Sequence, residues 1–242
     1  MERGRKMKMK KLLTILLVCL MVLSTGIVVF AADEIKTTTV KTVSIADTFK
    51  DAEKWDAMEG TVEFKDGKLQ YVKAGEALFG YQGAEYTDEL LQFKAKFSFE
   101  GGSVWQGVAI RAAATRTVAW SGNPSYLVVV KQDQIELQRF SAKGVQTFLA
   151  IIPNDGVIED QKEYNISIGA VNLNDGVNIM LFVDDACIFN YFDNSEDAIK
   201  TGGYMNIYGG NEIILSEYDN KNSLTDLPAA VTISGEAKEG ER

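Results

Sequence analysis

The stretch Tyr164–Asp193, YNISIGAVNLNDGVNIMLFVDDACIFNYFD, decides the class of fold. Its three apolar runs contain many β-branched and aromatic residues and no proline, and their apolar side chains recur with a period nearer 2 than 3.6. The first turn, Asn174-Asp175-Gly176, has residues that tolerate positive φ, and Asp184-Asp185 suits a short hairpin loop. The stretch therefore predicts three antiparallel strands joined by tight turns.

The rest of the chain continues this pattern of short strands. In Leu90–Phe99 the residues alternate between apolar and polar, which predicts one buried face and one wetter face. The pair Asp66-Gly67 marks a hairpin turn. The other expected strands, each bounded by polar or glycine breaks, are Thr61–Phe64, Lys68–Val72, Ala77–Tyr81, Val104–Ala113, Tyr126–Lys131, Ile135–Phe140, Thr147–Ile151, Tyr204–Tyr208 and Glu212–Tyr218.

Regularly spaced short strands with almost no amphipathic helix predict an all-β sandwich or barrel. We expect it to form one domain over residues 45–221, with a short turn of helix at Asp51–Trp55. Residues 33–44, DEIKTTTVKTVS, are rich in threonine and bury little, so we expect an extended lead-in.

The first 32 residues have the organisation of a secretory signal peptide. Met1–Lys11 is basic, Leu12–Phe30 is almost continuously apolar, and the small residues Ala31-Ala32 follow. We therefore expect a secreted, extracellular or cell-surface protein with cleavage near Ala32. The alternative is an uncleaved signal anchor, because the apolar stretch is long enough to span a bilayer.

Removal of the signal makes the chain strongly acidic. Six of the 25 basic residues and one of the 34 acidic residues lie in the first 32, which leaves a net charge of -14 for residues 33–242. Such a surface repels nucleic acid and anionic membranes, so we expect neither as a partner. The acidity serves solubility, or it includes a cation site built from carboxylates.

Two cysteines occur, and Cys19 lies within the signal. Cys187 then has no partner for a disulfide in the same chain. Its apolar neighbours favour a buried small hydrophobic residue, and the alternative is an intermolecular bridge.

The chain contains no histidine, which excludes Ser-His-Asp and Cys-His catalysis and the usual zinc sites. Glycoside hydrolysis remains, and it needs two carboxylates about 5–5.5 Å or about 6.5–9.5 Å apart. Ile158–Glu163 is polar and precedes the strand that begins at Tyr164, and Asp184-Asp185 lies at a hairpin tip, so both are expected to be solvated turns. Even on a strand, the adjacent residues Asp184 and Asp185 would face opposite ways and could not act as a carboxylate pair.

The order of several phrases resembles the concanavalin A-like jelly rolls, and particularly the laminin G-like modules of bacterial secreted proteins. The resemblance implies a two-sheet antiparallel jelly-roll sandwich with a concave face that in many members binds sugar chains. Hydrolases on this fold that resemble glycoside hydrolase family 16 carry Glu-x-Asp-x-x-Glu on one strand, and Ile158–Glu163 lacks that spacing. The phrases that carry the resemblance are Trp55 with Gly60–Leu69, Gly107–Arg111, Ser125–Val130, Asn178–Asp193 and Gly202–Tyr204.

The tail changes character after Lys221. Residues 222–228 form a linker, and Val231–Gly240 resembles the first strand of bacterial immunoglobulin-like surface repeats. The resemblance implies the start of a second, truncated module within 222–242, and the alternative is a plain charged tail.

Sugars are held by aromatic faces together with a few polar groups that contact hydroxyls. By period 2, Trp105, Ala109 and Arg111 share one side of their strand, and Trp120 lies in a loop between strands, where recognition residues often occur. The alternative is that Arg111 pairs with an internal acid and that the tryptophans fill the core. The expected ligand-binding residues are Trp105, Gln106, Arg111, Trp120, Tyr126, Tyr204 and Tyr208.

The sequence indicates no cofactor other than a structural calcium ion, which the resemblance implies. Asp47 near the first strand and Asp219 near the last would be its ligands if the two ends of the domain pair.

Three functions follow as hypotheses. The first is a secreted, non-catalytic module that binds a glycan or polysaccharide or mediates adhesion. The second is a glycoside hydrolase or lyase on the same fold, and the third is a structural spacer joined to further modules of a larger surface protein.

Overall fold

The computed structural model describes residues 41–58, 62–71, 77–99, 105–173, 176–209, 213–216 and 238–239. The chain separates into two compact units, Met1–Thr37 and Thr38–Arg242, and every described residue belongs to the second. The expected signal peptide and most of the tail therefore lie outside the described residues. Within the described part, no helix has the length and apolar character needed to cross a membrane.

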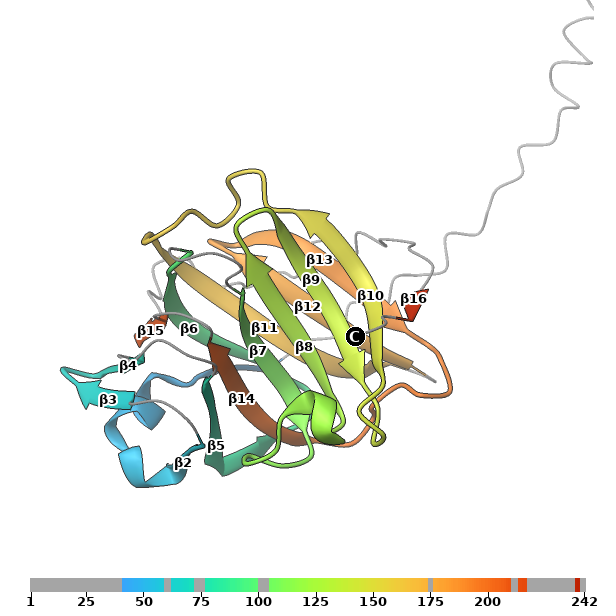
Figure 1. The fold of residues 1–242 in the computed structure, drawn as a ribbon, viewed down its shortest axis with the longest axis horizontal. Coiled ribbons are helices and arrows are strands. Elements are labelled where there is room, and N and C mark those ends of the chain that lie inside the picture. The colour runs from blue at the N-terminus through green and yellow to red at the C-terminus, as the bar shows by residue number, and fades with distance from the viewer. Residues whose placement is uncertain are drawn as a thin grey trace, which may run out of the picture. The chain divides into compact units, whose positions relative to one another are not determined.

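The described residues form two sheets that pack face to face, as the strand pattern predicts (Figure 1). Sheet A has the order β13-β12-β11-β6-β15-β4-β3, with β1 beside β6, and sheet B has the order β16-β10-β9-β8-β7-β14-β5-β2. Apart from the parallel pair β1–β6, the pairings are antiparallel. The bounds of sheet A are β1 Lys41–Ser44, β3 Val62–Lys65, β4 Lys68–Tyr71, β6 Glu89–Phe97, β11 Glu163–Leu173, β12 Gly176–Val183, β13 Ala186–Asp193 and β15 Ile213–Ser216.

Sheet B faces the viewer in Figure 1, with β8 and β9 in front of β11 and β12. Three short 3₁₀ helices, η1 Ala46–Lys50, η2 Ala52–Lys54 and η3 Ala119–Ser121, are the described helical segments. The bounds of sheet B are β2 Trp55–Ala57, β5 Ala77–Tyr86, β7 Trp105–Ala112, β8 Ser125–Lys131, β9 Gln134–Phe140, β10 Gln146–Pro153, β14 Gly203–Gly209 and β16 Lys238–Glu239.

The predicted meander is the run β11–β12–β13 of sheet A. Asp184 and Asp185 have φ values of 46° and 67°, so both central residues of the second hairpin loop are left-handed. That conformation matches the twist of the flanking strands, and aspartate tolerates it better than most side chains. The first hairpin closes at the pair Leu173↔Gly176, and the two residues between them are not described.

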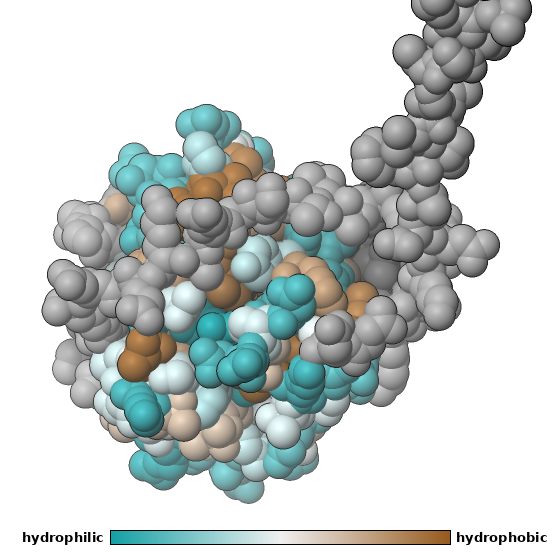
Figure 2. Space-filling model, turned by 90° about the vertical axis from the view of Figure 1, so that its right-hand side faces the viewer, coloured by the Kyte–Doolittle hydropathy of each residue, from teal (hydrophilic) through white to brown (hydrophobic). Residues whose placement is uncertain are grey.

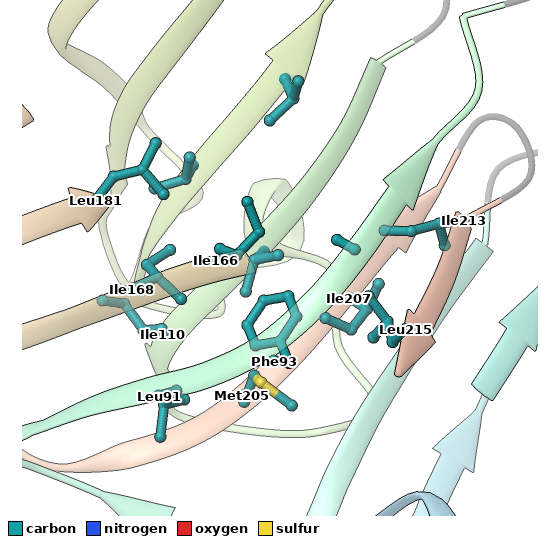
Figure 3. Close-up of a cluster of buried hydrophobic side chains, with 14 of the residues drawn as sticks. Leu91, Phe93, Ile110, Ile166, Ile168, Leu181, Met205, Ile207, Ile213 and Leu215 are labelled. Atoms are coloured by element: carbon teal, nitrogen blue, oxygen red, sulfur yellow. The ribbon is translucent and has the colours of Figure 1, made fainter. Parts of the chain in front are cut away.

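The main core lies between the two sheets. Figure 3 shows side chains of β6 and β11 from sheet A meeting side chains of β7 and β14 from sheet B. Phe93 and Ile168 of sheet A and Met205 and Ile207 of sheet B are fully buried. Strand alternation thus supplies one apolar face from each sheet, which is the physical basis of a sandwich.

Two segments near the start of the domain differ from expectation. The expected helical turn at Asp51–Trp55 is present as η2, and its C-cap Trp55 also begins an unexpected strand, β2, which pairs with β5 at Tyr81, 5.3 Å away between ring centroids. Strand β1 pairs with β6 inside the expected lead-in 33–44, so sheet A begins by Lys41.

Cys187 lies at the outer face of sheet A. It is half-buried and packs against Leu90, Val171, Met180 and Phe182. Figure 2 shows the side of the molecule that lies to the right in Figure 1, where hydrophilic residues are interspersed with small hydrophobic areas.

Candidate functional site

The outer face of sheet B, which points away from sheet A, carries its own apolar cluster. Residues on β5, β7, β8, β9 and β14 that alternate with the core positions form this cluster, and Trp105, Val118 and Trp120 pack against it. Its fully buried members are Leu78, Ala109, Ala119, Leu127, Val129, Phe140 and Tyr208. A sheet face that is apolar and flanked by partly buried aromatic rings is a candidate recognition surface.

Three aromatic rings meet on this face. The ring centroids of Trp105 and Trp120 lie 5.9 Å apart in an edge arrangement, and those of Trp120 and Tyr208 lie 5.7 Å apart. Tyr208 is buried beneath the indoles, and burial raises the pKa of its hydroxyl to about 12. Trp105 and Trp120 keep intermediate exposure, so each indole has surface left for a ligand.

A constrained loop holds Trp120 in this arrangement. Residues 113–124 connect β7 to β8 and pass through η3, the green coil at the lower end of these strands in Figure 1. The buried side chain of Asn123 accepts from the Ala114 N–H (2.9 Å) and donates to the carbonyls of Ala114 (2.9 Å) and Thr117 (2.6 Å). Asn206 of β14 donates to the same Ala114 carbonyl at 2.9 Å. The indole is therefore positioned before any ligand arrives, which lowers the entropic cost of binding.

The turn at Gly144 supports this loop and gives a testable prediction. Gly144 has a φ of +74°, and a Cβ placed on it would lie 2.3 Å from the Trp120 carbonyl oxygen. Gly156 has a similar φ of +79°, but a Cβ there would meet nothing within 4 Å. We expect Gly156→Ala to lower the free energy of unfolding by roughly 1–2 kcal/mol through strain alone.

Gly144→Ala should lower the free energy of unfolding by about 1–3 kcal/mol more than Gly156→Ala, because the added methyl group overlaps backbone atoms of the loop. It should also change the tryptophan fluorescence of the folded protein, which Gly156→Ala should leave unchanged. Chemical denaturation followed by fluorescence measures both effects. Equal stability of the two variants would contradict the contact between Gly144 and the loop.

A polar cluster adjoins the aromatic rings on the same face. Lys131, which pairs with Trp105 across the strands, donates to Oε1 of Glu136, as does Gln134, and Gln138 donates to Oε2 of Glu136. Glu136 is only 2% exposed, whereas the side chain of Lys131 is 33% exposed. We define the outer-face site as Trp105, Trp120, Lys131, Gln134, Glu136 and Gln138.

Sequence reasoning missed this polar cluster. Its signal was the alternation of Gln134, Glu136 and Gln138 with apolar residues along β9. On an isolated strand that alternation indicates a solvated face, and only the strand order shows that β9 lies inside sheet B.

Arg111 lies on the other side of sheet B, so the expectation that it shares a face with Trp105 and Ala109 is wrong. Its φ of 54° and a register shift opposite β14 mark a bulge, which turns the side chain toward sheet A. There it is 2% exposed and forms an ion pair with Asp88 at 3.2 Å, so Arg111 is held inside the protein as the alternative expects, although the side chain of Asp88 is itself 52% exposed. Its other hydrogen-bond acceptors are the carbonyls of Thr87, Ala170 and Ile199 and the side chain of Asn172.

Tyr126 is also buried between the sheets. Its hydroxyl donates to Asp193 at 2.8 Å and accepts from the Ile199 N–H at 3.0 Å. Burial, reinforced by the charge of Asp193, raises the pKa of this hydroxyl far above its usual value. The residue therefore has no surface for a ligand.

Gln106 and Tyr204 also lie apart from the aromatic rings. Gln106 is fully buried and donates to the carbonyl of Ser98, which follows β6 of sheet A. Tyr204 pairs with Ala112 beside Arg111, where it lines a small cavity of about 10 Å³. A hydrogen bond with Glu85 raises the pKa of the Tyr204 hydroxyl. Of the expected residues, the outer-face site thus brings together Trp105 and Trp120, with Tyr208 beneath them.

The structure does not test the expected calcium site, because it describes only one of the two expected ligands. Asp47 lies in η1, and Asp219 is outside the described residues. Among the residues that the structure describes, no cluster of three or more acidic, histidine or cysteine side chains could hold a metal ion.

The expected acidic turns are turns in the structure. Glu159 lies in a solvated turn, where its exposed side chain forms an ion pair with Lys162, and Asp184-Asp185 closes a hairpin. Across the fully described strands β14, β7, β8, β9 and β10, Glu136 is the one carboxylate residue.

No protein-family model matches the chain, and no curated protein matches its sequence. Among solved structures, the carbohydrate-binding module CBM66 from Bacillus subtilis aligns at 14% identity over 68% of this chain and 93% of its own, with a TM-score of 0.51. A Bacillus subtilis protein of unknown function with a galectin-like fold aligns at 13% identity over 70% of this chain and 89% of its own, with a TM-score of 0.50.

A glycoside hydrolase of family 16 from Bacteroides ovatus, solved with a glucan product, aligns at 12% identity over 71% of this chain and 84% of its own. Its TM-score of 0.46 is too low to support an inference. Identities this low establish the fold and not the function. The chain is an all-β, two-sheet antiparallel sandwich with the jelly-roll fold of the concanavalin A-like type.

Proposed function

We propose that the outer-face site binds a glycan without cleaving it. The observation that carries this proposal is the pair of partly exposed indoles, Trp105 and Trp120, whose ring centroids lie 5.9 Å apart beside the Lys131–Glu136 cluster. Aromatic faces bury the apolar C–H surface of a sugar ring, and neighbouring polar groups hydrogen-bond its hydroxyls.

The surroundings of the site support a binding role. The loop that carries Trp120 is held by Asn123 and Asn206, so the site is organised in the free protein. Hydrolysis of a glycosidic bond needs two facing carboxylates, and strands β7, β8, β9, β10 and β14, which carry or adjoin the site, supply Glu136 alone. The solved module from Bacillus subtilis that shares this fold is described as carbohydrate-binding, which agrees with the proposal.

We extend the proposal to the parts of the chain outside the described residues. Residues 1–32 would direct export, so the domain would act outside the cell or at its surface. Within the jelly-roll class we place the domain nearest to laminin G-like modules, and residues 231–240 would begin an immunoglobulin-like repeat. Mass spectrometry of the protein secreted by its host tests the first point, because cleavage near Ala32 leaves residue 33 at the N-terminus.

Loss of either indole should weaken glycan binding. We expect Trp120→Ala and Trp105→Ala each to lower the affinity for any glycan that the wild type binds by tenfold or more, about 1.4 kcal/mol, because stacking area is lost. The measurement is a glycan-array screen of the full chain followed by titration calorimetry on the strongest ligands.

Phe192→Ala is the matched control for this screen. Phe192 is 38% exposed but lies on β13 of sheet A, so its loss should leave the affinity unchanged. Circular dichroism confirms that each variant is folded. A folded wild type that binds no glycan, or a Trp120→Ala variant that binds as tightly as the wild type, would refute the proposed site.

A further inference from the structure

The outer face of β9 buries a carboxylate that the packing of the two sheets does not require. Glu136 points away from sheet A and is 2% exposed, with donors on both carboxylate oxygens. Replacing a buried ion pair by well-packed apolar residues is often neutral or stabilising. Glu136 is buried although its ion-pair partner Lys131 is 33% exposed, and a buried carboxylate of this kind suggests a role beyond stability.

Glu136 fixes what its three partners present to a ligand. Gln134 and Gln138 both turn their NH₂ groups toward the carboxylate, but Gln138 is 4% exposed, so Gln134 is the one that keeps a carbonyl oxygen, an acceptor, for a ligand. Lys131 donates one of its three N–H groups to Glu136 and keeps a 33% exposed side chain. The cluster thus combines the amide acceptor of Gln134 with the ammonium donor of Lys131, a set that suits hydroxyl groups, which both donate and accept.

The charges at the site cancel. Lys131 and Glu136 contribute one charge of each sign, and the other charged residues of the same five strands, Arg111 and Arg139, are buried against Asp88 and Asp193. The chain as a whole carries a net charge of -9. A glycan with carboxylate or sulfate groups would therefore meet no excess of positive charge at the site and a repulsive field around it.

We propose that Glu136 is a positioning residue that makes the outer-face site selective for neutral glycans over acidic ones. It does so by neutralising Lys131 and by orienting the partly exposed amide of Gln134. The inference rests on the proposed function, because it names the class of glycan for the same site.

The test measures selectivity and not affinity alone. Neutral polysaccharides are each paired with their C6-carboxylated derivative, and affinity electrophoresis of the full chain gives the ratio of the two affinities. We expect the wild type to prefer the neutral member of each bound pair. Glu136→Gln should shift this ratio about tenfold toward the acidic member, because Lys131 then carries an uncompensated charge.

Two further variants separate the local effect from a general one. Glu163→Gln removes the same charge from a partly exposed site on sheet A, where Glu163 pairs with Lys94 at 3.2 Å, and it should leave the ratio unchanged. The double variant Lys131→Met, Glu136→Gln should restore the neutral preference, since it removes the uncompensated charge. A structural defect would lower both affinities and would not be rescued in this way.

The outcomes separate the inference from the proposed function. A wild type that prefers acidic glycans, or a ratio that Glu136→Gln and Glu163→Gln change equally, overturns the inference while glycan binding stands. A folded wild type that binds neither member of any pair overturns the proposed function and the inference together.

Discussion

Replacing Arg111 by methionine should lower the free energy of unfolding by about 3–5 kcal/mol, one of the two largest effects that we expect from a single substitution. The guanidinium lies at a bulge in β7 and reaches across to sheet A, where it is 2% exposed. It donates to the carbonyls of Thr87 at 2.7 Å, Ala170 at 3.0 Å and Ile199 at 2.6 Å. Methionine fills part of the volume but leaves these acceptors without a donor, at roughly 1–3 kcal/mol for the buried Ala170 carbonyl and less for the part-buried carbonyls of Thr87 and Ile199.

Arg116→Met provides the matched control for this prediction. Arg116 carries the same charge, but its side chain is 68% exposed and lies 3.5 Å from Asp56. An exposed pair of this kind contributes between about 0 and 1 kcal/mol. Urea denaturation measures the free energy of unfolding of both variants. If Arg111→Met and Arg116→Met lower it equally, Arg111 does not stabilise the packing of the two sheets.

The second large effect is expected at the ion pair between Arg139 and Asp193. Both side chains are buried, and Arg139 Nη1 lies 2.8 Å from Asp193 Oδ2. Asp193→Asn should lower the free energy of unfolding by about 3–5 kcal/mol, because Arg139 then keeps a buried charge without its main partner. Asp197→Asn is the control, since Asp197 is 76% exposed and lies 3.5 Å from the same arginine.

The same pair predicts a dependence on pH. Burial by itself would raise the pKa of Asp193, but hydrogen bonds from Ser195, Arg139 and Tyr126 outweigh it and hold the pKa below its usual value. A carboxylate with a lowered pKa stabilises the fold fully above its unfolded pKa of about 3.9, and this contribution is lost as the pH falls through the folded pKa. The free energy of unfolding of the wild type should therefore exceed that of Asp193→Asn by a constant amount from about pH 5 to 7, on the order of 3–5 kcal/mol. This difference should shrink below about pH 4. A difference that already shrinks at neutral pH would contradict this account.

The strands and the class of fold were predictable because alternation is a local property. Tyr164–Asp193 alternates with period 2, and β11, β12 and β13 follow it. The hairpin at Asp184-Asp185 was also predictable, because few residue types tolerate positive φ at both central positions. These features depend on neighbours in sequence and not on distant contacts.

The face of Arg111 was not predictable from its strand. Period 2 places it with Trp105 and Ala109, but one extra residue in β7 opposite β14 reverses the alternation beyond Ala109. Nothing in the local sequence marks the bulge. Its cause is tertiary, because the guanidinium finds acceptors on Ala170 and Asn172 of β11 in sheet A.

The candidate site was half predictable. Trp105 and Trp120 were expected to bind a ligand, and the structure places their rings together above Tyr208. The polar half was missed because the contact of Lys131 with Glu136 depends on the register between β8 and β9. That register is set by turns and packing over the whole sheet and is not visible in either strand alone.

Oxidation of the three tryptophans tests the central claim, that a glycan lies on the outer face of sheet B. N-bromosuccinimide is applied to the full chain with and without a saturating glycan, and mass spectrometry reports the oxidation of each indole. Trp55 is 8% exposed in the core and serves as the internal standard. We predict that Trp105 and Trp120 oxidise in the free protein and are protected when the glycan is bound. Bound glycan with Trp105 and Trp120 oxidised at the rate of the free protein would contradict the claim and move the binding site to another surface.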